Sequence, residues 1–335
     1  MRREVSKLDA AKKQERMEAL DLLKGLGIIL VLIAHTDAAP GFYRIFSTFY
    51  MSLFFWGSGF LHQREARFRD LLYKKSKTLF SYYIVGGGIY LLLDLHRFGF
   101  IPSLILRELE GLFLFPTTDK MPSYGGALWF IPCLFCVELL IFIIDRVTEK
   151  YQSVLVAGLS LLGIGLSQYF NGQSLRLIWA IDTALVAVGI YFIGMCCRKW
   201  GFIQICAKIR WFWIVGIFLY LWHFAVQNPI SMWANIYSDP FLFWHNAVIG
   251  SILSFTIVLK LSNSKRGKIL KSVMAYAGRN SIVIYITHPF IIWAYTYGFK
   301  ETVPNQLANF TGFVITFILC ICIVQLKTII SKLQF

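Results

Sequence analysis

Long apolar segments separated by short polar loops are the feature that most constrains the fold of this chain. They run near residues 20–39, 41–61, 77–95, 125–145, 152–168, 177–196, 211–227, 242–261, 281–298 and 306–326. Most are long enough to cross about 30 Å of hydrocarbon as a helix. Because 57% of the residues are apolar and only 15% are charged, a soluble globular domain is excluded. The sequence predicts an all-α integral membrane protein with about ten transmembrane helices.

The distribution of basic residues orients these helices. Of the 33 Lys and Arg residues, 26 fall in the terminal segments and the loops on the same side, and five fall in the opposite loops. Positive charge accumulates on the cytoplasmic side of membrane proteins. We therefore expect both termini to be cytoplasmic, in a multi-pass protein of the cell membrane. The basic residues that give the chain its net charge of +15 lie mostly on this cytoplasmic side, where they orient the helices. Nucleic acid is therefore not an expected partner.

No repeat, low-complexity tract or large soluble insertion divides the chain. We expect a cytoplasmic N-terminal arm over residues 1–18 and a single membrane domain over residues 19–330. The seven cysteines are an odd number, and most lie in or beside apolar segments, which does not indicate a disulfide framework. Cys133 and Cys136 have metal-like spacing, but no second pair of ligands accompanies them, so no metal is expected.

Ionisable side chains within the apolar segments are costly to insert, so each needs a partner or a function. Lys24 and His35 are eleven positions apart, which on an α-helix is three turns plus about 20° and a rise of about 16 Å. Both therefore lie on one face of the first predicted helix. A lysine can bind an anionic group, and an imidazole can accept a proton from a hydroxyl. Alternatively, Lys24 extends to the interface and His35 bonds to a neighbouring carbonyl.

The segment that carries Lys24 and His35, residues 16–36, resembles the first helix of acyltransferase family 3, the membrane O-acyltransferases. The resemblance is strongest to the fucose 4-O-acetylase-like branch. Three further segments resemble family motifs in the same order: residues 49–61, the Leu-Trp-Phe-Ile-Pro segment 128–132, and the Ser-x-x-x-Tyr-x-x-His helix within residues 278–288. Together they extend the resemblance over nearly the whole chain.

Two positions of the second motif depart from the pattern of that branch. Tyr50 stands in place of a histidine, and Ser52 stands in place of a proline. A tyrosine hydroxyl can donate a hydrogen bond but cannot act as a base near neutral pH. We therefore expect Tyr50 to contact the substrate and not to move a proton.

The resemblance implies an enzyme that moves an acetyl group, or another acyl group, from acetyl-CoA to a carbohydrate hydroxyl. The acceptor would be an envelope polysaccharide or a lipid-linked glycan. His35 is then the candidate general base, because a sugar hydroxyl must lose its proton as it attacks. Either Glu138 or Asp182 is the candidate catalytic carboxylate that orients the imidazole, and the sequence does not distinguish between them. Alternatively, Glu138 and Asp182 each pair with another buried polar group and have no catalytic role.

The phosphates of coenzyme A require cationic partners at the cytoplasmic rim. The candidate donor-binding residues are Lys24, Lys74, Lys77, Arg64 and Arg67. Family members carry a basic-x-x-basic element before the third helix, and Lys74-x-x-Lys77 fits that place better than Arg64-x-x-Arg67. Alternatively, these charges only set the topology.

The candidate substrate-binding residues are His288, Trp129 and Tyr50. Pro289 follows His288 and frees a backbone carbonyl, which indicates that this helix borders a cavity. Packing in the core is the alternative reading for these side chains. A polytopic sugar or lipid transporter is the alternative function, although the two halves of the chain show no inverted repeat.

Overall fold

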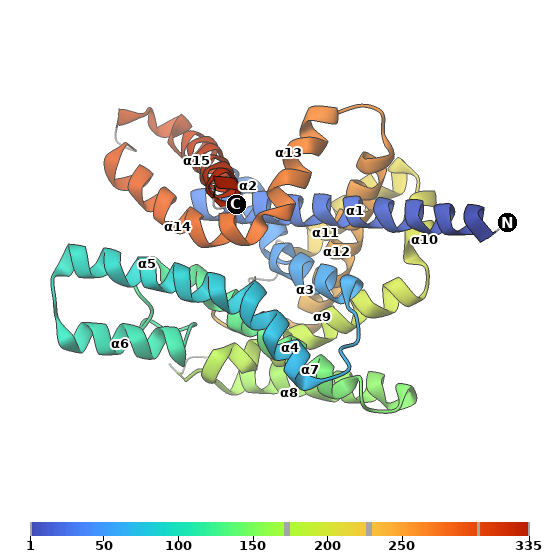
Figure 1. The fold of residues 1–335 in the computed structure, drawn as a ribbon, viewed down its shortest axis with the longest axis horizontal. Coiled ribbons are helices and arrows are strands. Elements are labelled where there is room, and N and C mark those ends of the chain that lie inside the picture. Colours follow the sequence, from blue (N-terminus) through green and yellow to red (C-terminus); the bar gives the residue numbers. More distant parts are fainter. Residues whose placement is uncertain (1, 171–174, 226–229, 300–301, 334–335) are drawn as a thin grey trace.

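The computed structural model describes residues 2–170, 175–225, 230–299 and 302–333, and helices dominate it (Figure 1). The α-helices are α1 (Arg2–Thr36), α2 (Pro40–Ser47), α3 (Tyr50–Leu61), α4 (Phe68–Lys75), α5 (Ser81–Phe98), α6 (Pro102–Phe113), α7 (Phe130–Ile144), α8 (Glu149–Phe170), α9 (Ile181–Lys199), α10 (Phe202–Lys208), α11 (Trp211–Ala225), α12 (Pro240–Asn263), α13 (Lys268–Arg279), α14 (Ser281–Gly298) and α15 (Asn305–Leu333). Shorter helical turns lie at Ser76–Phe80, Gly125–Trp129 and Ile178–Ala180. Strands β1 (Ile230–Ser231) and β2 (Ile236–Tyr237) form one antiparallel pair. The prediction of an all-helical membrane protein is confirmed, with this small hairpin as an addition.

The predicted count of ten spans is not confirmed. In the described part of the chain, six helices are long and apolar enough to cross a membrane: Phe68–Phe98, Gly125–Ile144, Glu149–Phe170, Ile178–Lys199, Pro240–Asn263 and Leu307–Ile329. A seventh would be the pair Phe202–Lys208 and Trp211–Phe224, which is bent by 101°. Of the ten predicted segments, the structure therefore supports six or seven as candidate spans by length and composition.

The segment predicted as one span over residues 41–61 is divided into α2 and α3. A helix of 12 residues such as α3 rises about 18 Å, which is too short for the hydrocarbon layer. Most residues of α3 are buried, and the helix packs against α9 inside the bundle. Its apolar side chains therefore serve the protein core, which hydropathy alone cannot distinguish from a lipid-facing surface.

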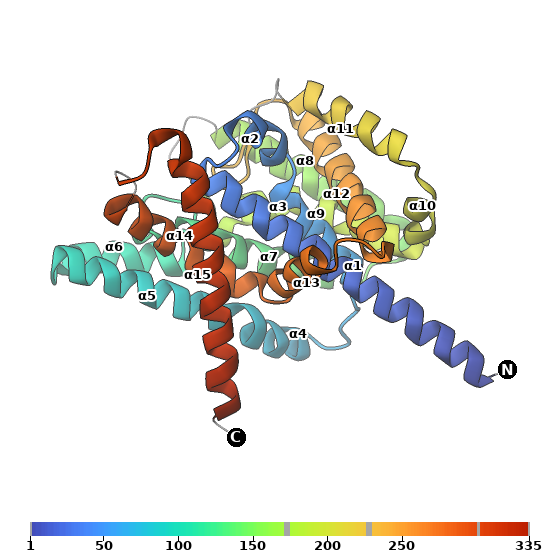
Figure 2. The same cartoon turned by 90° about the horizontal axis from the view of Figure 1, so that it is seen from above.

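Helix α1 is central to the bundle. Figures 1 and 2 show it crossing the molecule, and it contacts α3, α12, α13, α14 and α15. The contact with α13 is close: a Cβ atom at Gly25 would overlap the Met274 carbonyl oxygen, and one at Gly278 would overlap that of Asp21. These two glycines allow the two helices to approach backbone to backbone.

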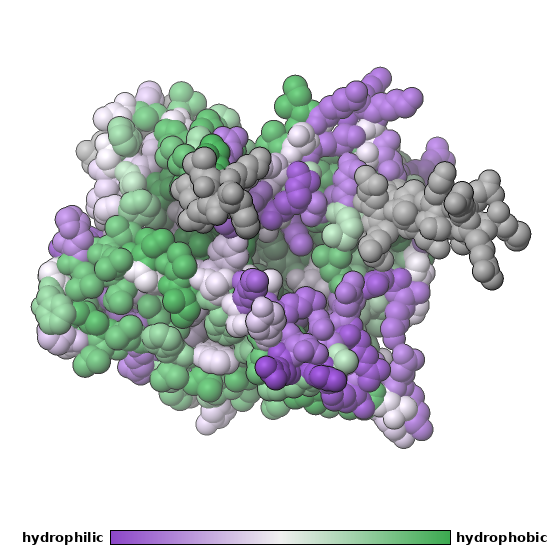
Figure 3. All heavy atoms as spheres, in the orientation of Figure 1, coloured by the Kyte–Doolittle hydropathy of each residue, from purple (hydrophilic) through white to green (hydrophobic). Residues whose placement is uncertain are grey.

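Surface hydropathy follows the arrangement of the helices. In Figure 3, hydrophilic residues gather on the side where α4 and α13 lie, whereas apolar residues cover α5 and α6. Large apolar side chains of α5, α8 and α11 are exposed, among them Leu92, Leu161 and Phe212. Exposed apolar area on this scale requires a partner surface, which the lipid bilayer supplies.

The hairpin β1–β2 is fastened to α9 by a buried ion pair. The Arg176 guanidinium donates from Nε to Asp182 Oδ2 at 2.6 Å, and its other nitrogens donate to the Trp233 carbonyl at 2.6 Å and to Thr183 Oγ1 at 3.0 Å. Asp182 is fully buried. The Asn235 amide also donates to Asp182 Oδ2, at 3.4 Å. These contacts hold the hairpin at the end of the bundle where His35 lies.

Replacement of Gly59 tests the close packing of α3 on α9. A Cβ atom there would overlap the Tyr191 carbonyl oxygen, whereas nothing lies within 4 Å of the same atom at Gly158. We expect Gly59→Ala to lower the free energy of unfolding by about 1–3 kcal/mol. Gly158→Ala, in an exposed helix, should be neutral or stabilising. Thermal unfolding in detergent measures both, and equal midpoints would contradict the packing argument.

Replacement of Arg176 tests the buried ion pair. Arg176→Met leaves the Asp182 carboxylate buried without its cation, which should lower the free energy of unfolding by about 3–5 kcal/mol. The matched control is Lys120→Met, which removes a pair with Glu110 whose side chains are 36% and 40% exposed. That change should cost at most about 1 kcal/mol. Similar losses in the two variants, measured by denaturation in detergent, would refute a special role for Arg176.

Candidate functional site

A cavity of about 430 Å³ opens beside Lys24, and we call it the Lys24 cavity. Helices α1, α3, α4, α7, α9 and α14 all contribute to its wall. The apolar part of the wall comes from residues such as Leu53, Phe54 and Leu134. A lysine and an apolar wall together suit a ligand that carries a long neutral chain and a negative group.

The Lys24 cavity holds several charged side chains, and most of them are paired. Lys75 donates to the Glu138 carboxylate, and both side chains are largely buried. Lys74 donates to Glu65 Oε1 at 2.6 Å nearer the surface. Within the described residues, Lys24 makes no hydrogen bond or ion pair, and the Asp21 carboxylate acts on it at longer range. Lys24 is therefore the cation of this cavity that remains available for a ligand.

A second cavity, also of about 430 Å³, opens beside His35, and we call it the His35 cavity. Aromatic rings form much of its wall, contributed by Tyr43, Tyr50, Tyr124, Trp129, Trp233 and Tyr285. In the part of the chain that the structure describes, no Lys, Arg, Asp or Glu side chain lines it. The cavity is thus uncharged and rich in hydroxyl groups and aromatic faces.

The neighbour of His35 is another histidine. The ring centroids of His35 and His288 are 5.0 Å apart, and the ring planes are tilted by 56°. His288 Nδ1 lies 3.3 Å from the Ile284 carbonyl oxygen, and it must donate in this contact because a carbonyl only accepts. In neutral His288 the other nitrogen, Nε2, then carries a lone pair. Nε2 is buried without a hydrogen-bond partner among the described residues.

The two cavities meet at Tyr285, which lines both of them. The Tyr285 hydroxyl donates to the Ala127 carbonyl oxygen. The segment that begins at Ala127 also separates the cavities, since Trp129 faces the His35 cavity and Phe130 faces the Lys24 cavity. The Tyr285 side chain and the backbone segment that begins at Ala127 therefore separate the Lys24 cavity from the His35 cavity.

The far wall of the His35 cavity is held by polar contacts from α5. Asp94 Oδ2 accepts from the Ser123 backbone N–H at 2.7 Å, and Arg97 donates to the Tyr124 hydroxyl at 2.8 Å. Glu108 of α6 lies against Asp94, and burial together with this carboxylate raises the pKa of Glu108 to about 7. Asp94 thus positions the loop that carries two residues of the cavity wall.

The structure does not bring either candidate carboxylate to His35. Glu138 is paired with Lys75 in the Lys24 cavity, and Asp182 is paired with Arg176 beneath the hairpin. The expected hydrogen bond, in which the His35 imidazole N–H would donate to Glu138 or Asp182, is therefore not present. Both carboxylates lie where a buried cation neutralises them, which is the alternative that the sequence left open.

The candidate donor-binding residues are separated by the structure. Lys24 and Lys74 line the Lys24 cavity. Arg64 lines a neighbouring cavity instead, and exposed Arg67 precedes α4 without lining either. Lys77 is exposed and does not line the Lys24 cavity. It lies on the π-helical turn Ser76–Phe80, where the wider turn rotates it away from the face that carries Lys74.

The candidate substrate-binding residues Tyr50 and Trp129 both line the His35 cavity. His288 is fully buried behind His35 and lies outside that lining. Lys75 and Tyr285 also line the Lys24 cavity, and neither is among the candidate site residues predicted from the sequence. Nothing in the sequence distinguishes Lys75 from its neighbours Lys74 and Lys77. Tyr285, by contrast, is the tyrosine of the Ser-x-x-x-Tyr-x-x-His motif, and that motif could have identified it.

Comparison with known proteins identifies the family. The chain matches the family model of an acyltransferase domain, that of acyltransferase family 3, over residues 17–326. No curated protein and no solved structure matches the chain. The match covers the whole region that holds both cavities and supports an enzyme that transfers acyl groups, whereas nothing in the comparisons supports a transporter. The chain therefore belongs to acyltransferase family 3 and is a multi-pass membrane acyltransferase.

Proposed function

We propose that this protein is an O-acyltransferase that moves an acetyl group from acetyl-CoA to a carbohydrate hydroxyl. The observation that carries the proposal is the arrangement along α1: Lys24 lines one cavity, His35 lines the other, and the two cavities meet at Tyr285. Two substrates that approach from opposite ends of the bundle can meet there. Family membership supports acyl transfer, and the two cavities support a donor and an acceptor that bind separately.

The acetyl donor occupies the Lys24 cavity in this proposal. The basic loops at that end of the bundle support a cytoplasmic orientation, which gives acetyl-CoA access from its own compartment. Lys24, which has no ion pair in the part of the chain that the structure describes, offers its ammonium group, and the apolar wall suits the pantetheine chain. The thioester then lies toward Tyr285, on the way to the His35 cavity.

The acceptor occupies the His35 cavity. Sugar rings present C–H faces that pack on aromatic side chains, and their hydroxyls bond to neutral polar groups. The wall of this cavity supplies both and carries no charge among the described residues. These features support an uncharged glycosyl unit of an envelope polysaccharide or a lipid-linked glycan on the outer side of the cell membrane.

The reaction follows from the placement of His35. Its imidazole accepts the proton of the acceptor hydroxyl while the oxygen attacks the thioester carbonyl carbon. The tetrahedral intermediate collapses with cleavage of the C–S bond, and the coenzyme A sulfur takes the proton that His35 holds. An ester and free coenzyme A result, so the imidazole returns to its neutral form.

His288 is the positioning residue for His35 in this mechanism. Its Nδ1 proton is held by the Ile284 carbonyl, so its buried Nε2 can accept a hydrogen bond. The His35 ring lies next to it, with the ring centroids 5.0 Å apart, and no hydrogen bond joins the two rings as they stand. An N–H of His35 directed at His288 leaves the other nitrogen of His35 free to act as the base.

Substitution of His35 tests the assignment of the base. His35→Ala should lower acetyl transfer by roughly 10²–10⁴-fold without loss of folded protein, since that is the usual contribution of general acid–base catalysis. Exposed His96 provides the control substitution, His96→Ala, which should retain activity. The measurement is mass spectrometry of envelope glycans from cells that lack the gene and carry each variant. A folded His35→Ala protein with normal transfer would refute the assignment, and acetylation confined to a soluble cytoplasmic sugar would refute only the outer acceptor.

Substitution of Lys24 tests the donor site. Lys24→Ala should weaken acetyl-CoA binding by about 1–3 kcal/mol, because a charge-assisted hydrogen bond is lost. Isothermal titration of the detergent-purified protein measures the affinity. Lys268→Ala is the control, because it removes an exposed lysine at the same end of the bundle. Equal affinities for the two variants would remove Lys24 from the donor site.

A further inference from the structure

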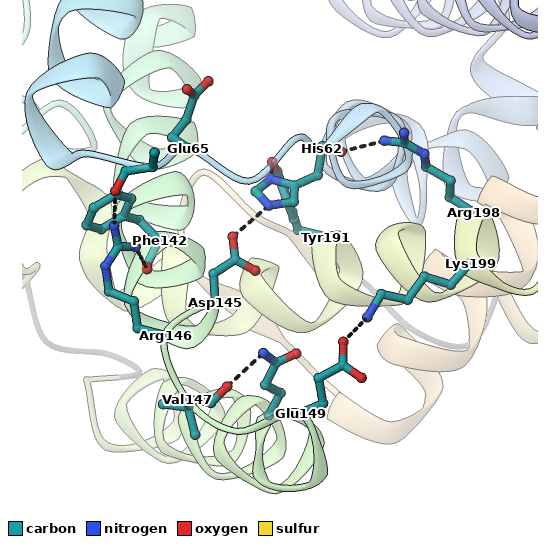
Figure 4. A network of polar contacts seen from close by, with 12 residues as sticks. His62, Glu65, Phe142, Asp145, Arg146, Val147, Glu149, Tyr191, Arg198 and Lys199 are labelled. Atoms are coloured by element: carbon teal, nitrogen blue, oxygen red, sulfur yellow. Dashed lines mark hydrogen bonds and ion pairs between the residues drawn. The ribbon is translucent and has the colours of Figure 1, made fainter.

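The Lys24 cavity has two unlike ends. Just after α7 ends, Asp145 Oδ2 lies 2.8 Å from His62 Nε2, and the Tyr191 hydroxyl lies 3.1 Å from His62 Nδ1, so that end is polar (Figure 4). Where α7 starts, the cavity is bounded by aromatic rings, those of Phe54, Phe130 and Tyr285. Phe130 and Asp145 are 15 positions apart, which is a rise of about 22 Å along the helix. The cavity therefore runs from a polar end to an aromatic end.

The rings of Phe54, Phe130 and Tyr285 form one packed group, which we call the aromatic wall. The Phe130 ring centroid lies 5.7 Å from that of Phe54 and 5.7 Å from that of Tyr285, and both contacts are edge-to-face. Fully buried Phe55, which does not line the cavity, also packs on Phe130, with the ring centroids 5.0 Å apart. Phe130 is therefore the middle ring of the wall, and it is only 8% exposed.

The two outer rings of the aromatic wall are held in place. The Tyr285 hydroxyl donates to the Ala127 carbonyl oxygen. Phe54 lies against α1, where a Cβ atom at Gly27 would be 2.9 Å from Phe54 Cζ. Close packing of this kind leaves few voids into which a large side chain can rotate. The aromatic wall therefore limits the length of the space in front of it.

The acyl group of the donor has to lie against the aromatic wall. In the proposed reaction, the thioester carbonyl meets the acceptor hydroxyl at Tyr285, where the two cavities meet. The acyl chain continues from that carbonyl, so it lies beside the wall or enters the His35 cavity, which the acceptor occupies. An acetyl group adds only one methyl group there. Each further methylene has to displace either a packed ring or the acceptor.

We propose that Phe130 sets the length of the acyl group that the enzyme transfers, so that acetyl is accepted and butyryl and longer chains are excluded; this inference rests on the proposed function. Phe130 contacts both other rings of the wall and makes no hydrogen bond through its side chain, so its contribution is its volume. Tyr285 also packs on His288, with the ring centroids 5.8 Å apart, so a change there would disturb the His35 cavity as well. One methylene in a hydrophobic pocket changes discrimination by about 10–200-fold.

The test compares Phe130→Ala with the control Phe135→Ala. Phe135 lies on the same helix, is 4% exposed and packs on Phe80 and Trp179, but it lines neither cavity. Purified protein in detergent receives equal concentrations of acetyl-CoA and butyryl-CoA, with envelope glycans from cells that lack the gene as acceptor. Mass spectrometry gives the ratio of acetyl to butyryl esters. We expect the unmodified protein and the control to favour acetyl by at least about a hundredfold, and Phe130→Ala to lose at least about tenfold of that preference.

The outcomes distinguish this inference from the proposed function. Equal transfer of acetyl and butyryl by the unmodified protein, or an unchanged preference in Phe130→Ala, would overturn the role of Phe130 and leave acyl transfer intact. An equal loss of preference in Phe135→Ala would overturn it too, because loosened packing would then explain the effect. Unmodified protein that forms neither ester would overturn the proposed function and this inference with it. Phe130→Leu, with an apolar side chain of intermediate size, guards against misfolding of Phe130→Ala and should show a smaller loss in the same direction.

Discussion

The cost of placing charge in an apolar interior governs how this bundle is assembled. Beneath the hairpin, Arg176 and Asp182 are buried and paired with each other. Asp94 is fully buried and accepts a backbone N–H from Ser123. An unpaired ion in such a place would cost several kcal/mol. Among the described residues, Lys24 faces a cavity and makes no ion pair, which is the observation behind its proposed role in donor binding.

Helix α1 connects the two ends of the site. It packs closely on α13 through Gly25 and Gly278, so its backbone cannot shift without separating the two helices. Lys24 and His35 are thereby held on one face of a rigid helix. Such a scaffold suits the proposed reaction, in which donor and acceptor come from opposite sides and neither substrate needs to cross the bilayer.

Glu138 and Asp182, the two candidates for the carboxylate that orients His35, are both paired with other residues. Asp182 holds the hairpin that carries Met232 and Trp233 into the wall of the His35 cavity. Glu138 neutralises Lys75 in the Lys24 cavity. His288 occupies the position beside His35 instead. In the proposed mechanism, a neutral His288 imidazole beside His35 avoids a second charge in the core, but it does not give the imidazolium the stabilisation that a carboxylate would give.

The sequence by itself determined the helical membrane class, the family and the alignment of Lys24 with His35, because apolar length and helical period are local properties. It did not determine the number of spans, since α3 is as apolar as a span but is buried in protein. It also could not pair Glu138 with Lys75, 63 positions away, or bring His288 to His35. Only the tertiary structure decided those contacts, because the packing of distant helices selects which polar groups meet and which face a cavity.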